Sequence, residues 1–328
     1  MAETTYNPEH LNMQKTSTTG VAPLFSPAVN RYVLDRAKEQ LYFSQFGQQI
    51  TVPRGKGKTI TFDRMEPLTV STAALVEGVT PQGDNLAITR ITAIPTQHGR
   101  YVTTTDEFDF YKHDPSPEAL KLGELFAENA AGTYDKLTLN VLKAGTNVQY
   151  AGGAATMAAI ASTGKFGVAE VKKAVRTLMK NKAKRFGDSF VCVIDADMEY
   201  DLKSETTSGS WIDVTKYKDT EKIYSGEIGK LYGVRFVVTT QNLIEQEAAE
   251  ASGSNAAKLE LHCAYFFGQD AYGTTGEKGN IETIWKNKGS GGTADPLEQR
   301  STAGWKGHHC AKILTEGWMV RAICAVSE

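Results

Sequence analysis

Apolar residues near the start of the chain follow a helical spacing. Four of them recur at every fourth position: Val29, Val33, Ala37 and Leu41. This spacing places them on one face of a helix, for which Ser26 and Pro27 suit the first turn and Gly47 the end. The residues before Ser26 are mostly polar and contain little to bury. We therefore expect residues 1–47 to form a flexible arm followed by one helix.

A β-rich segment follows over residues 48–100. Short strand-like runs occur at residues 50–52, 59–62 and 86–91, and glycine or proline residues separate them. The segment contains few large apolar residues for its length. The pattern fits an extended hairpin that packs on another chain, and it fits an independent small β-domain equally well. The pattern alone leaves both interpretations open.

A long helix is expected over residues 117–144, and Gly145 ends it. Its apolar residues keep a helical stripe: Leu122, Phe126, Ala130, Tyr134, Leu137 and Val141. About 28 residues at ~1.5 Å each give a length of roughly 42 Å. A helix of this length suits a strut along a flat molecule better than it suits a compact domain.

Alternating helices and strands indicate a second lobe that begins near Gly164. An amphipathic helix is expected over residues 168–178. Continuous apolar runs follow at residues 190–194, 234–238 and 264–267. Such runs are typical of strands that are covered on both faces. The mixture makes this lobe α/β or α+β, and strand character returns at the end of the chain.

Composition and charge add further limits. The 328 residues exceed one typical domain, and the formal net charge of -2 means that no global positive field attracts nucleic acid. No apolar stretch reaches the ~20 residues that a membrane helix needs, and the polar N-terminus lacks the apolar run of a secretion signal. We therefore expect synthesis in a cytoplasm. The four cysteines are widely spaced and are expected to be free, buried thiols.

The run Gly55-Lys56-Gly57-Lys58-Thr59 invites comparison with a phosphate-binding loop. That motif needs a further glycine five positions before Gly57, where this chain has Val52 followed by Pro53. The run therefore predicts a basic hairpin turn, and no nucleotide site is expected.

Acidic residues cluster directly after one of the apolar runs. Asp195, Asp197 and Glu199 could bind a metal ion or act as an acid–base pair. No histidine or second acidic cluster completes the set, and capping of a helix that begins near Ala196 explains Asp195 without a ligand. A metal-dependent hydrolase that uses Asp195, Asp197 and His308 is the alternative function that these residues leave.

The run His308-His309-Cys310 also resembles a set of metal ligands. Adjacent residues on a strand point to opposite faces, so neighbours rarely share one ion. His262 and Cys263 would supply further ligands, but nothing in the spacing demands it. We therefore expect no catalytic residues, no metal site and no cofactor.

Basic residues gather in and after the helix of the second lobe. The set is Lys172, Lys173, Arg176, Lys180, Lys182, Lys184 and Arg185. A solvated helix face is the simplest interpretation. The functional interpretation is contact with DNA phosphates or with acidic groups on a neighbouring subunit. Few aromatic residues are interleaved, so stacking on bases is not expected.

Several segments, in their order along the chain, resemble one protein family. They are residues 57–64 (GKTITFDR), 75–81 (LVEGVTP), 140–148 (NVLKAGTNV), 226–236 (GEIGKLYGVRF), 267–273 (FGQDAYG), 296–300 (PLEQR) and 304–306 (GWK). This order is similar to that in major capsid proteins of podovirus-type tailed bacteriophages. The resemblance covers most of the chain, from about Arg31 to Val326.

The resemblance implies the α+β fold of tailed-phage major capsid proteins, which encapsulin compartments share. An N-terminal arm and first helix over residues 1–47 precede an extended β-hairpin loop over 48–100. A peripheral domain with a long spine helix covers 101–163, and an axial α/β domain covers 164–280. Residues 281–328 supply strands that return to the peripheral domain.

The resemblance also implies a structural role rather than an enzymatic one. The implied function is self-assembly into hexamers and pentamers of an icosahedral shell that encloses double-stranded DNA, with an encapsulin-like compartment shell as the alternative. The implied partners are further copies of the chain, a portal, a scaffolding protein, DNA held without sequence specificity and, optionally, a decoration protein. No membrane partner is implied. Assembly is expected in the cytoplasm of a host bacterium, and the mature location is the virion capsid.

Charged residues on the expected hairpin are the candidate contacts between subunits: Lys56, Lys58, Arg64, Glu66 and Glu77. Some family members join subunits through Lys–Asn isopeptide bonds. Lys56 and Lys58 would be the donors, but no partner asparagine stands out, so crosslinking is not expected. Only a short polar arm precedes the first expected helix, so the scaffold is expected to be a separate protein.

Overall fold

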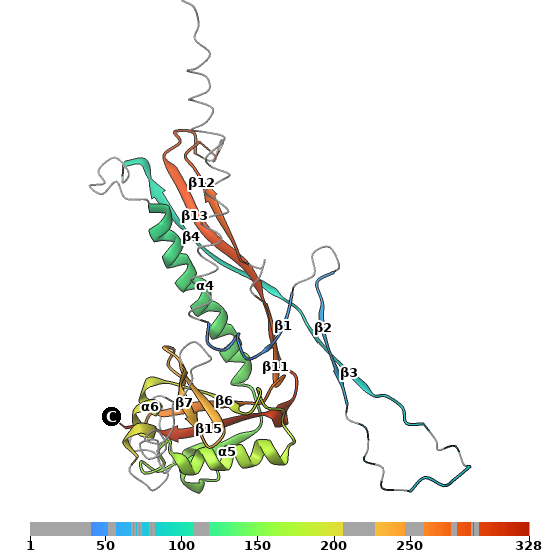
Figure 1. Ribbon diagram of the computed structural model, residues 1–328. Coiled ribbons are helices and arrows are strands. Elements are labelled where there is room, and N and C mark those ends of the chain that lie inside the picture. The colour runs from blue at the N-terminus through green and yellow to red at the C-terminus, as the bar shows by residue number, and fades with distance from the viewer. Residues whose placement is uncertain are drawn as a thin grey trace, which may run out of the picture.

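A computed structural model shows a rounded lobe, a long arm and a hairpin that projects from the junction between them (Figure 1). It describes residues 41–51, 57–66, 68, 70, 72, 74–78, 80, 83–107, 118–205, 227–246, 259–276, 281–289, 291 and 295–327. Among these residues, no helix has both the length and the apolar character needed to cross a membrane.

The long arm is built on α4 (Glu118–Leu142), which confirms the helix expected at residues 117–144. A three-stranded antiparallel sheet lies beside this helix (Figure 1). Its strands, in spatial order, are β12 (Ile281–Lys286), β13 (Arg300–His309) and β4 (Thr96–Thr105). The 25 residues of α4 span roughly 37 Å, so the helix runs along the arm as a strut.

One face of α4 packs on this sheet. Phe126, Ala130 and Tyr134, all on the expected apolar stripe, are buried in one cluster with Trp305 of β13. The ring of Trp305 meets the ring of Tyr134 edge to face at 5.9 Å, and its Nε1 donates a hydrogen bond to Asn129 Oδ1 at 3.0 Å. The stripe therefore faces the sheet, and an aromatic pair fixes the helix on it.

The lobe is built around a seven-stranded mixed sheet. Its strands, in spatial order, are β5 (Val148–Tyr150), β15 (Met319–Ala325), β10 (Leu261–Phe267), β6 (Phe190–Ile194), β8 (Val234–Val238) and β7 (Glu227–Leu231), and β9 (Ile244–Gln246) also pairs with β10. Strands β6 and β8 are parallel, whereas β10 is antiparallel to β6 and β15. This mixture and the separate arm sheet make the protein α+β.

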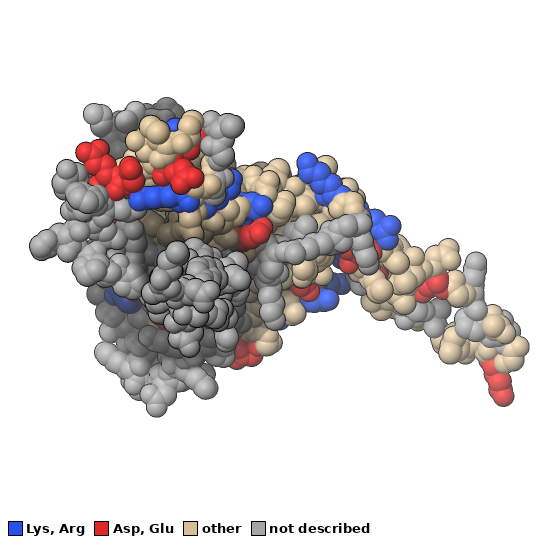
Figure 2. Space-filling model, turned by 90° about the horizontal axis from the view of Figure 1, so that it is seen from above, with Lys and Arg blue, Asp and Glu red and all other residues tan. Residues whose placement is uncertain are grey.

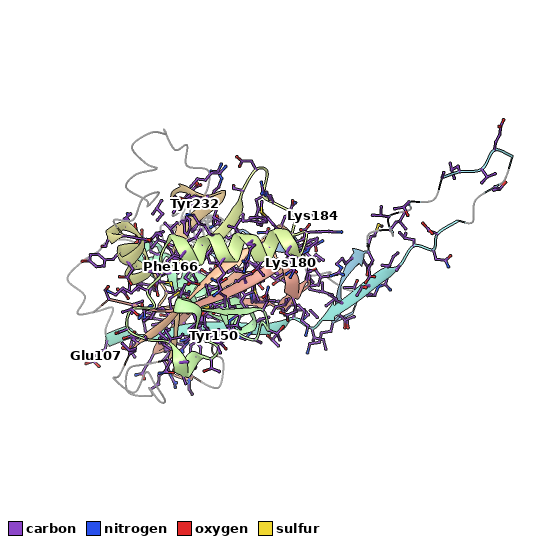
Figure 3. The ribbon with its side chains drawn as sticks, turned by 90° about the horizontal axis from the view of Figure 1, so that it is seen from below. Glu107, Tyr150, Phe166, Lys180, Lys184 and Tyr232 are labelled. Atoms are coloured by element: carbon purple, nitrogen blue, oxygen red, sulfur yellow. The ribbon has the colours of Figure 1, made fainter. Side chains whose placement is uncertain are left out.

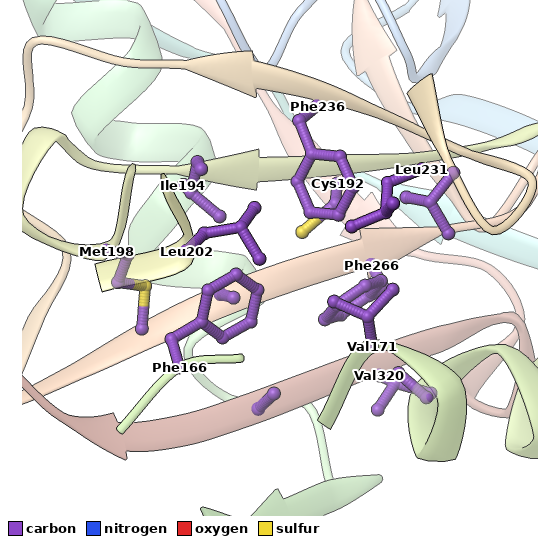
Figure 4. Packing of buried hydrophobic residues seen from close by; sticks show 14 of the residues in the cluster. Phe166, Val171, Cys192, Ile194, Met198, Leu202, Leu231, Phe236, Phe266 and Val320 are labelled. Atoms are coloured by element: carbon purple, nitrogen blue, oxygen red, sulfur yellow. The ribbon is translucent and has the colours of Figure 1, made fainter. Parts of the chain in front are cut away.

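Apolar side chains cover both faces of the lobe sheet. On one face lie α5 (Val168–Lys180) and α6 (Ala196–Ser204), the two helices expected in this region. Figure 4 shows Phe166, Val171 and Leu202 against Cys192, Phe236 and Phe266 of the sheet. Val191 and Val193 of β6 point the other way, into a second buried cluster. The apolar run at residues 190–194 is therefore a strand covered on both faces, as expected.

A small three-stranded sheet joins the parts of the molecule. Strand β11 (Tyr272–Thr275) lies between β1 (Gln48–Ile50), to which it is parallel, and β14 (Ala311–Ile313), to which it is antiparallel. Because β1 precedes the hairpin and β14 lies between β13 and β15 in the chain, this sheet connects hairpin, arm and lobe.

The projecting hairpin consists of β2 (Ile60–Met65) and β3 (Ile88–Ala93), close to two of the expected strands. They pair antiparallel, from Ile60 opposite Ala93 to Met65 opposite Ile88. Among the described residues, neither strand pairs with a third one. This geometry favours the extended hairpin over an independent β-domain. The ends of the expected segment 48–100 do not belong to it, because β1 pairs with β11 and β4 pairs with β13.

The expected N-terminal helix does not continue to Gly47. Residues from Leu41 to Gly47 form turns and bends. Asp135 of α4 accepts hydrogen bonds from the backbone N–H groups of Tyr42 at 2.8 Å and Phe43 at 3.2 Å, and Phe43 is fully buried. These tertiary contacts outweigh the helical spacing. The rest of the expected helix lies outside the described residues.

The expected division of the chain also needs a correction at its end. The expectation that residues 281–328 all return to the peripheral domain fits β12 and β13 only. Strand β15 lies between β5 and β10 in the lobe sheet, with all seven residues buried. A strand this apolar needs cover on both faces, which the lobe offers and the exposed arm sheet does not. Strand β5, from the 101–163 segment, joins the same sheet.

Candidate assembly surfaces

The outer part of the hairpin exposes apolar side chains. They are Met65, Leu68, Val70, Leu75, Val76, Leu86 and Ile88. Val70 and Leu75 are each 80% exposed. Figure 2 shows this part as a thin extension with mostly uncharged side chains. We name residues 65–88 the hairpin tip. So many exposed apolar residues in one segment mark a surface that another molecule covers.

The root of the hairpin packs on its own chain. Ile60, Phe62 and Ala93 are buried in one cluster with Leu314. Gly273 of β11 leaves space for the Phe62 ring, because a Cβ at position 273 would lie 2.2 Å from ring atom Cε1. The hairpin therefore has an anchored root and a tip without a core of its own.

Ion pairs brace the root. Arg90 of β3 donates two hydrogen bonds to Asp63 of β2, from Nε to Oδ1 at 2.8 Å and from Nη2 to Oδ2 at 3.2 Å. This hydrogen bonding lowers the pKa of the Asp63 carboxyl and raises the pKa of Arg90. Arg64 donates to Thr315 Oγ1 at 2.9 Å and lies 3.7 Å from Glu66. Arg64 thus links the hairpin to the body of the same chain.

The other candidate contacts differ in their surroundings. Glu66 accepts a hydrogen bond from Thr89 Oγ1 at 2.8 Å, across the hairpin. Lys58 and Glu77 are exposed, Lys58 beside the root and Glu77 in the tip. Lys56 lies outside the described residues. Lys58 and Glu77 are therefore better placed than Arg64 and Glu66 to reach a second chain.

The expected basic turn at residues 55–59 is described only from Gly57 onward. Gly57 has a φ of 94°, a left-handed conformation that glycine adopts readily and other residues rarely do. The structure shows a bend at Lys58, and residues 55 and 56 of the expected turn lie outside the described residues.

The basic residues of α5 do not share one face. Lys172 Nζ lies 4.4 Å from the centre of the Tyr232 ring. Lys173 Nζ donates to the Tyr150 carbonyl at 3.1 Å and lies 3.7 Å from Glu170. Figure 3 shows Tyr232 and Tyr150 on opposite sides of α5. These two lysines therefore bind groups of their own chain, on different sides of the helix.

The remaining basic residues gather at and beyond the C-terminal end of α5. We name as the basic end the exposed residues Lys180, Lys182, Lys184 and Arg185. Lys184 lies over the ring of Trp318 at 5.7 Å, and Arg185 lies over Phe190 at 5.2 Å. Arg176 is exposed on α5, one turn before the basic end. Figure 3 shows Lys180 and Lys184 on the side of the lobe that faces the hairpin.

A cavity of about 820 Å³ lies between the basic end and the hairpin root. Lys182 and Lys184 line one side, Phe62 and Arg64 of β2 line another, and Trp318 contributes to the wall. The basic end and the root of the hairpin therefore belong to one side of the molecule.

The acidic cluster after β6 contains a histidine, contrary to the sequence expectation. Asp195 caps α6 as expected, because its Oδ1 accepts from Met198 N at 3.1 Å. Its Oδ2 forms a hydrogen bond with His262 Nδ1. The other ring nitrogen, His262 Nε2, forms a hydrogen bond with Glu260 Oε1 at 2.9 Å. The sequence gives no sign of this cluster, because His262 stands on β10, 67 positions from Asp195.

His262 serves this cluster as a cation. Burial alone would lower the pKa of His262, but its hydrogen bonds to Asp195 and Glu260 raise the pKa to about 8. Asp195, Asp197 and His262 lie close enough together to surround a metal ion. A protonated imidazole offers no lone pair, however, and the positive end of the α6 dipole disfavours a second cation. The geometry supports a structural cluster of charged side chains.

The histidine pair on β13 also has a structural explanation. The ring of His309 is buried, stacks on Tyr134 at 4.7 Å, and contacts Thr138 Oγ1 at 3.0 Å and Thr275 Oγ1 at 3.2 Å. Burial lowers the pKa of His309 to about 4, so the ring is neutral at pH 7. His308 is exposed and lies on the arm sheet, whereas Asp195 belongs to the lobe. The residues of the hydrolase alternative are therefore not brought together.

The cysteines are packing residues. All four are free, as expected, and Cys192, Cys263 and Cys324 are buried, whereas Cys310 is half-buried. Burial raises the pKa of Cys263 to about 12. A protonated, buried thiol is a poor nucleophile and a poor metal ligand.

The chain belongs to the phage capsid protein family, whose family model matches residues 88–322. Its fold is similar to the capsid of Ralstonia phage GP4, with a TM-score of 0.68 and 16% identity over 88% of this chain and 92% of that chain. The head of Helicobacter pylori bacteriophage KHP40 gives a TM-score of 0.60, with 12% identity over 88% and 91%. The cyanophage Pam1 capsid gives 0.59, with 14% identity over 83% and 86%. A comparison with curated protein sequences yields no match.

Family and fold together define a major capsid protein, a structural protein whose copies assemble into the shell of a virion. The resemblance inferred from the sequence and the tailed-phage capsid fold are confirmed. The encapsulin and hydrolase alternatives are not favoured.

Proposed function

We propose that copies of this chain form the hexamers and pentamers of an icosahedral shell around double-stranded DNA, and that each hairpin tip lies on a neighbouring copy. The observation that carries the contact is the exposed apolar tip, including Val70 and Leu75. A two-stranded hairpin is marginal in water, so packing on another chain stabilises it. The tip and the surface that receives it are different parts of the sequence, so the tip of one copy contacts a different surface on the next copy. Such a heterologous contact lets copies close into rings.

Charged residues adjust this contact. Lys58 and Glu77 are the proposed contacts with the neighbour, together with Lys56 beside Lys58. Arg64 holds the root on the body of its own chain, and Glu66 accepts a hydrogen bond from Thr89 where the tip begins, so both orient the hairpin toward the neighbour. An exposed ion pair contributes only about 0–1 kcal/mol. Repetition at every subunit boundary makes such small contributions matter for a whole shell.

Further partners are proposed from family membership. They are a portal, a separate scaffolding protein, an optional decoration protein and the packaged DNA, with assembly in the cytoplasm of the host bacterium. The net charge of -2 supports an enclosure that lets DNA slide rather than one that grips it. The remaining basic residues Lys172, Lys173 and Arg176 are not needed for DNA contact in this proposal.

Replacement of the tip tests the proposed function. Residues 67–86 are replaced by a short Gly-Ser linker, which keeps both strands and the hydrogen bond from Glu66 N to Ala87 O at the end of the ladder. The root residues Ile60 and Phe62 stay in place, because they belong to the core of their own chain. Shells are counted by sedimentation and electron microscopy of the purified protein.

The expected result is shells from the unmodified chain and soluble, folded single copies from the linker variant. Val70→Asp should reduce assembly strongly. Leu297→Asp, at a similarly exposed apolar residue outside the tip, should not. Shells of normal size from the linker variant would contradict the proposal. An unfolded, aggregated product would show that the tip belongs to the core of its own chain.

A further inference from the structure

Opposite charges lie at opposite ends of strand β10 in the lobe. Beyond Phe267, the backbone N–H of Gln269 donates to the Lys184 carbonyl at 2.8 Å, which places the basic end there. At the other end of the strand, His262 forms a hydrogen bond with Asp195 at the start of α6. Seven residues of β-strand span roughly 20 Å. The two charged groups therefore lie roughly the length of β10 apart.

The acidic group surrounds the start of α6. Asp197 is 61% exposed and Glu260 is partly exposed, and we name these two residues the acidic end. With buried Asp195 they outnumber the single positive charge of His262, so a net negative charge remains. Figure 1 shows α6 at the edge of the lobe away from the hairpin.

The basic group keeps a net positive charge. Asp188 lies nearby in the chain, but it pairs with Lys230, and that bond lowers the pKa of the Asp188 carboxyl. Asp270 lines the same cavity as Lys182 and Lys184. Asp63 and Glu66 line this cavity too, but Asp63 pairs with Arg90, and Glu66 lies 3.7 Å from Arg64. Asp270 alone does not neutralise the four cations of the basic end.

We propose that the basic end of one copy meets the acidic end of the next copy around a capsomer. This inference rests on the proposed function. A ring contact joins two different surfaces of the same chain, so those surfaces must complement each other. Like charges brought together would oppose the contact, whereas opposite charges favour it and fix its register.

The position of the basic end supports this choice of partner. Lys182 and Lys184 line the same cavity as Phe62 and Arg64 at the hairpin root. The tip leaves the body on this same side (Figure 3). The copy that receives the tip is therefore also the copy that faces the basic end, and it presents its opposite side, where α6 lies.

A charge reversal on both sides tests the pairing. One variant carries Lys182→Glu with Lys184→Glu, a second carries Asp197→Lys, and a third carries all three changes. Glu260 is left unchanged because it bonds His262. The matched control is Lys286→Glu with Lys312→Glu, which makes the same charge change at exposed positions on β12 and β14. Shell yield is measured for each purified protein, with a thermal melt to confirm folding.

The first two variants should each yield at least tenfold fewer shells, and the third should recover most of the loss, since reversed charges again face opposite charges. The control should assemble normally. If Lys182→Glu with Lys184→Glu does not fold, Lys182→Gln with Lys184→Gln should lower the yield in the same direction. A third variant no better than the first two would overturn the proposal.

Two outcomes separate this inference from its rivals. Normal empty shells that fail to retain DNA would assign the basic end to the lumen and overturn the inference. Failure of the unmodified chain to form shells would instead overturn the proposed function itself.

Discussion

Phe62 of the hairpin and Gly273 of β11 are in such close contact that a Cβ at position 273 would lie 2.2 Å from the Phe62 ring. Phe62 is buried, so its ring has little space to move. Gly273→Ala should therefore lower the free energy of unfolding by about 1–3 kcal/mol through overpacking. Chemical denaturation of the unassembled linker variant measures this change without interference from shells.

Gly132 of α4 provides the control for that substitution. A Cβ at position 132 meets no atom within 4 Å. Gly132→Ala should raise the free energy of unfolding by about 0.5–1 kcal/mol, because alanine favours the helix over glycine. Equal effects of the two substitutions would show that the hairpin root is not packed against β11.

Phe126 and Leu125 are neighbours on α4 with opposite surroundings. Phe126 is buried against the arm sheet, whereas Leu125 is 60% exposed. Phe126→Ala should cost about 3–5 kcal/mol, and Leu125→Ala should cost less than about 0.5 kcal/mol in the unassembled chain. An unchanged melting temperature for Phe126→Ala would show that the apolar stripe does not face the arm sheet.

The His262 cluster predicts a dependence of stability on pH. The folded chain holds the His262 proton with a pKa of about 8, above the ordinary value of 6.5. The cluster therefore stabilises the fold fully below about pH 6.5, and the free energy of unfolding should fall as pH rises through 8. The loss should be on the order of 1–2 kcal/mol.

His262→Gln is the matched variant for this measurement. It should be less stable at pH 6.5 and should lose the slope between pH 6.5 and 8. His309 has its pKa lowered to about 4, so its titration lies below this interval. Identical slopes for the variant and the unmodified chain would refute a charged His262.

The local pattern of apolar residues is enough to predict elements whose burial shows in their own sequence. The helix at 117–144 and the strand at 190–194 can both be predicted, because each signals its burial through its own spacing or its own apolar run. The cap of α6 by Asp195 was likewise a local signal.

Contacts between distant segments could not be predicted. The place of β15 depends on pairing with β5 and β10, and its own apolar residues do not specify the partner. His262 joins Asp195 only because β10 lies beside β6 in the sheet. The division of the hairpin into root and tip depends on Gly273, far along the chain. Pattern identifies burial, but it does not identify the partner.

The direct test of the central claim is a cryo-electron microscopy map of the assembled, purified protein. The account predicts a closed shell in which residues 65–88 of each copy lie on the surface of an adjacent copy, while Phe62 stays packed against Gly273 of its own chain. A map in which the tip projects into solvent or folds back on its own chain would contradict the account.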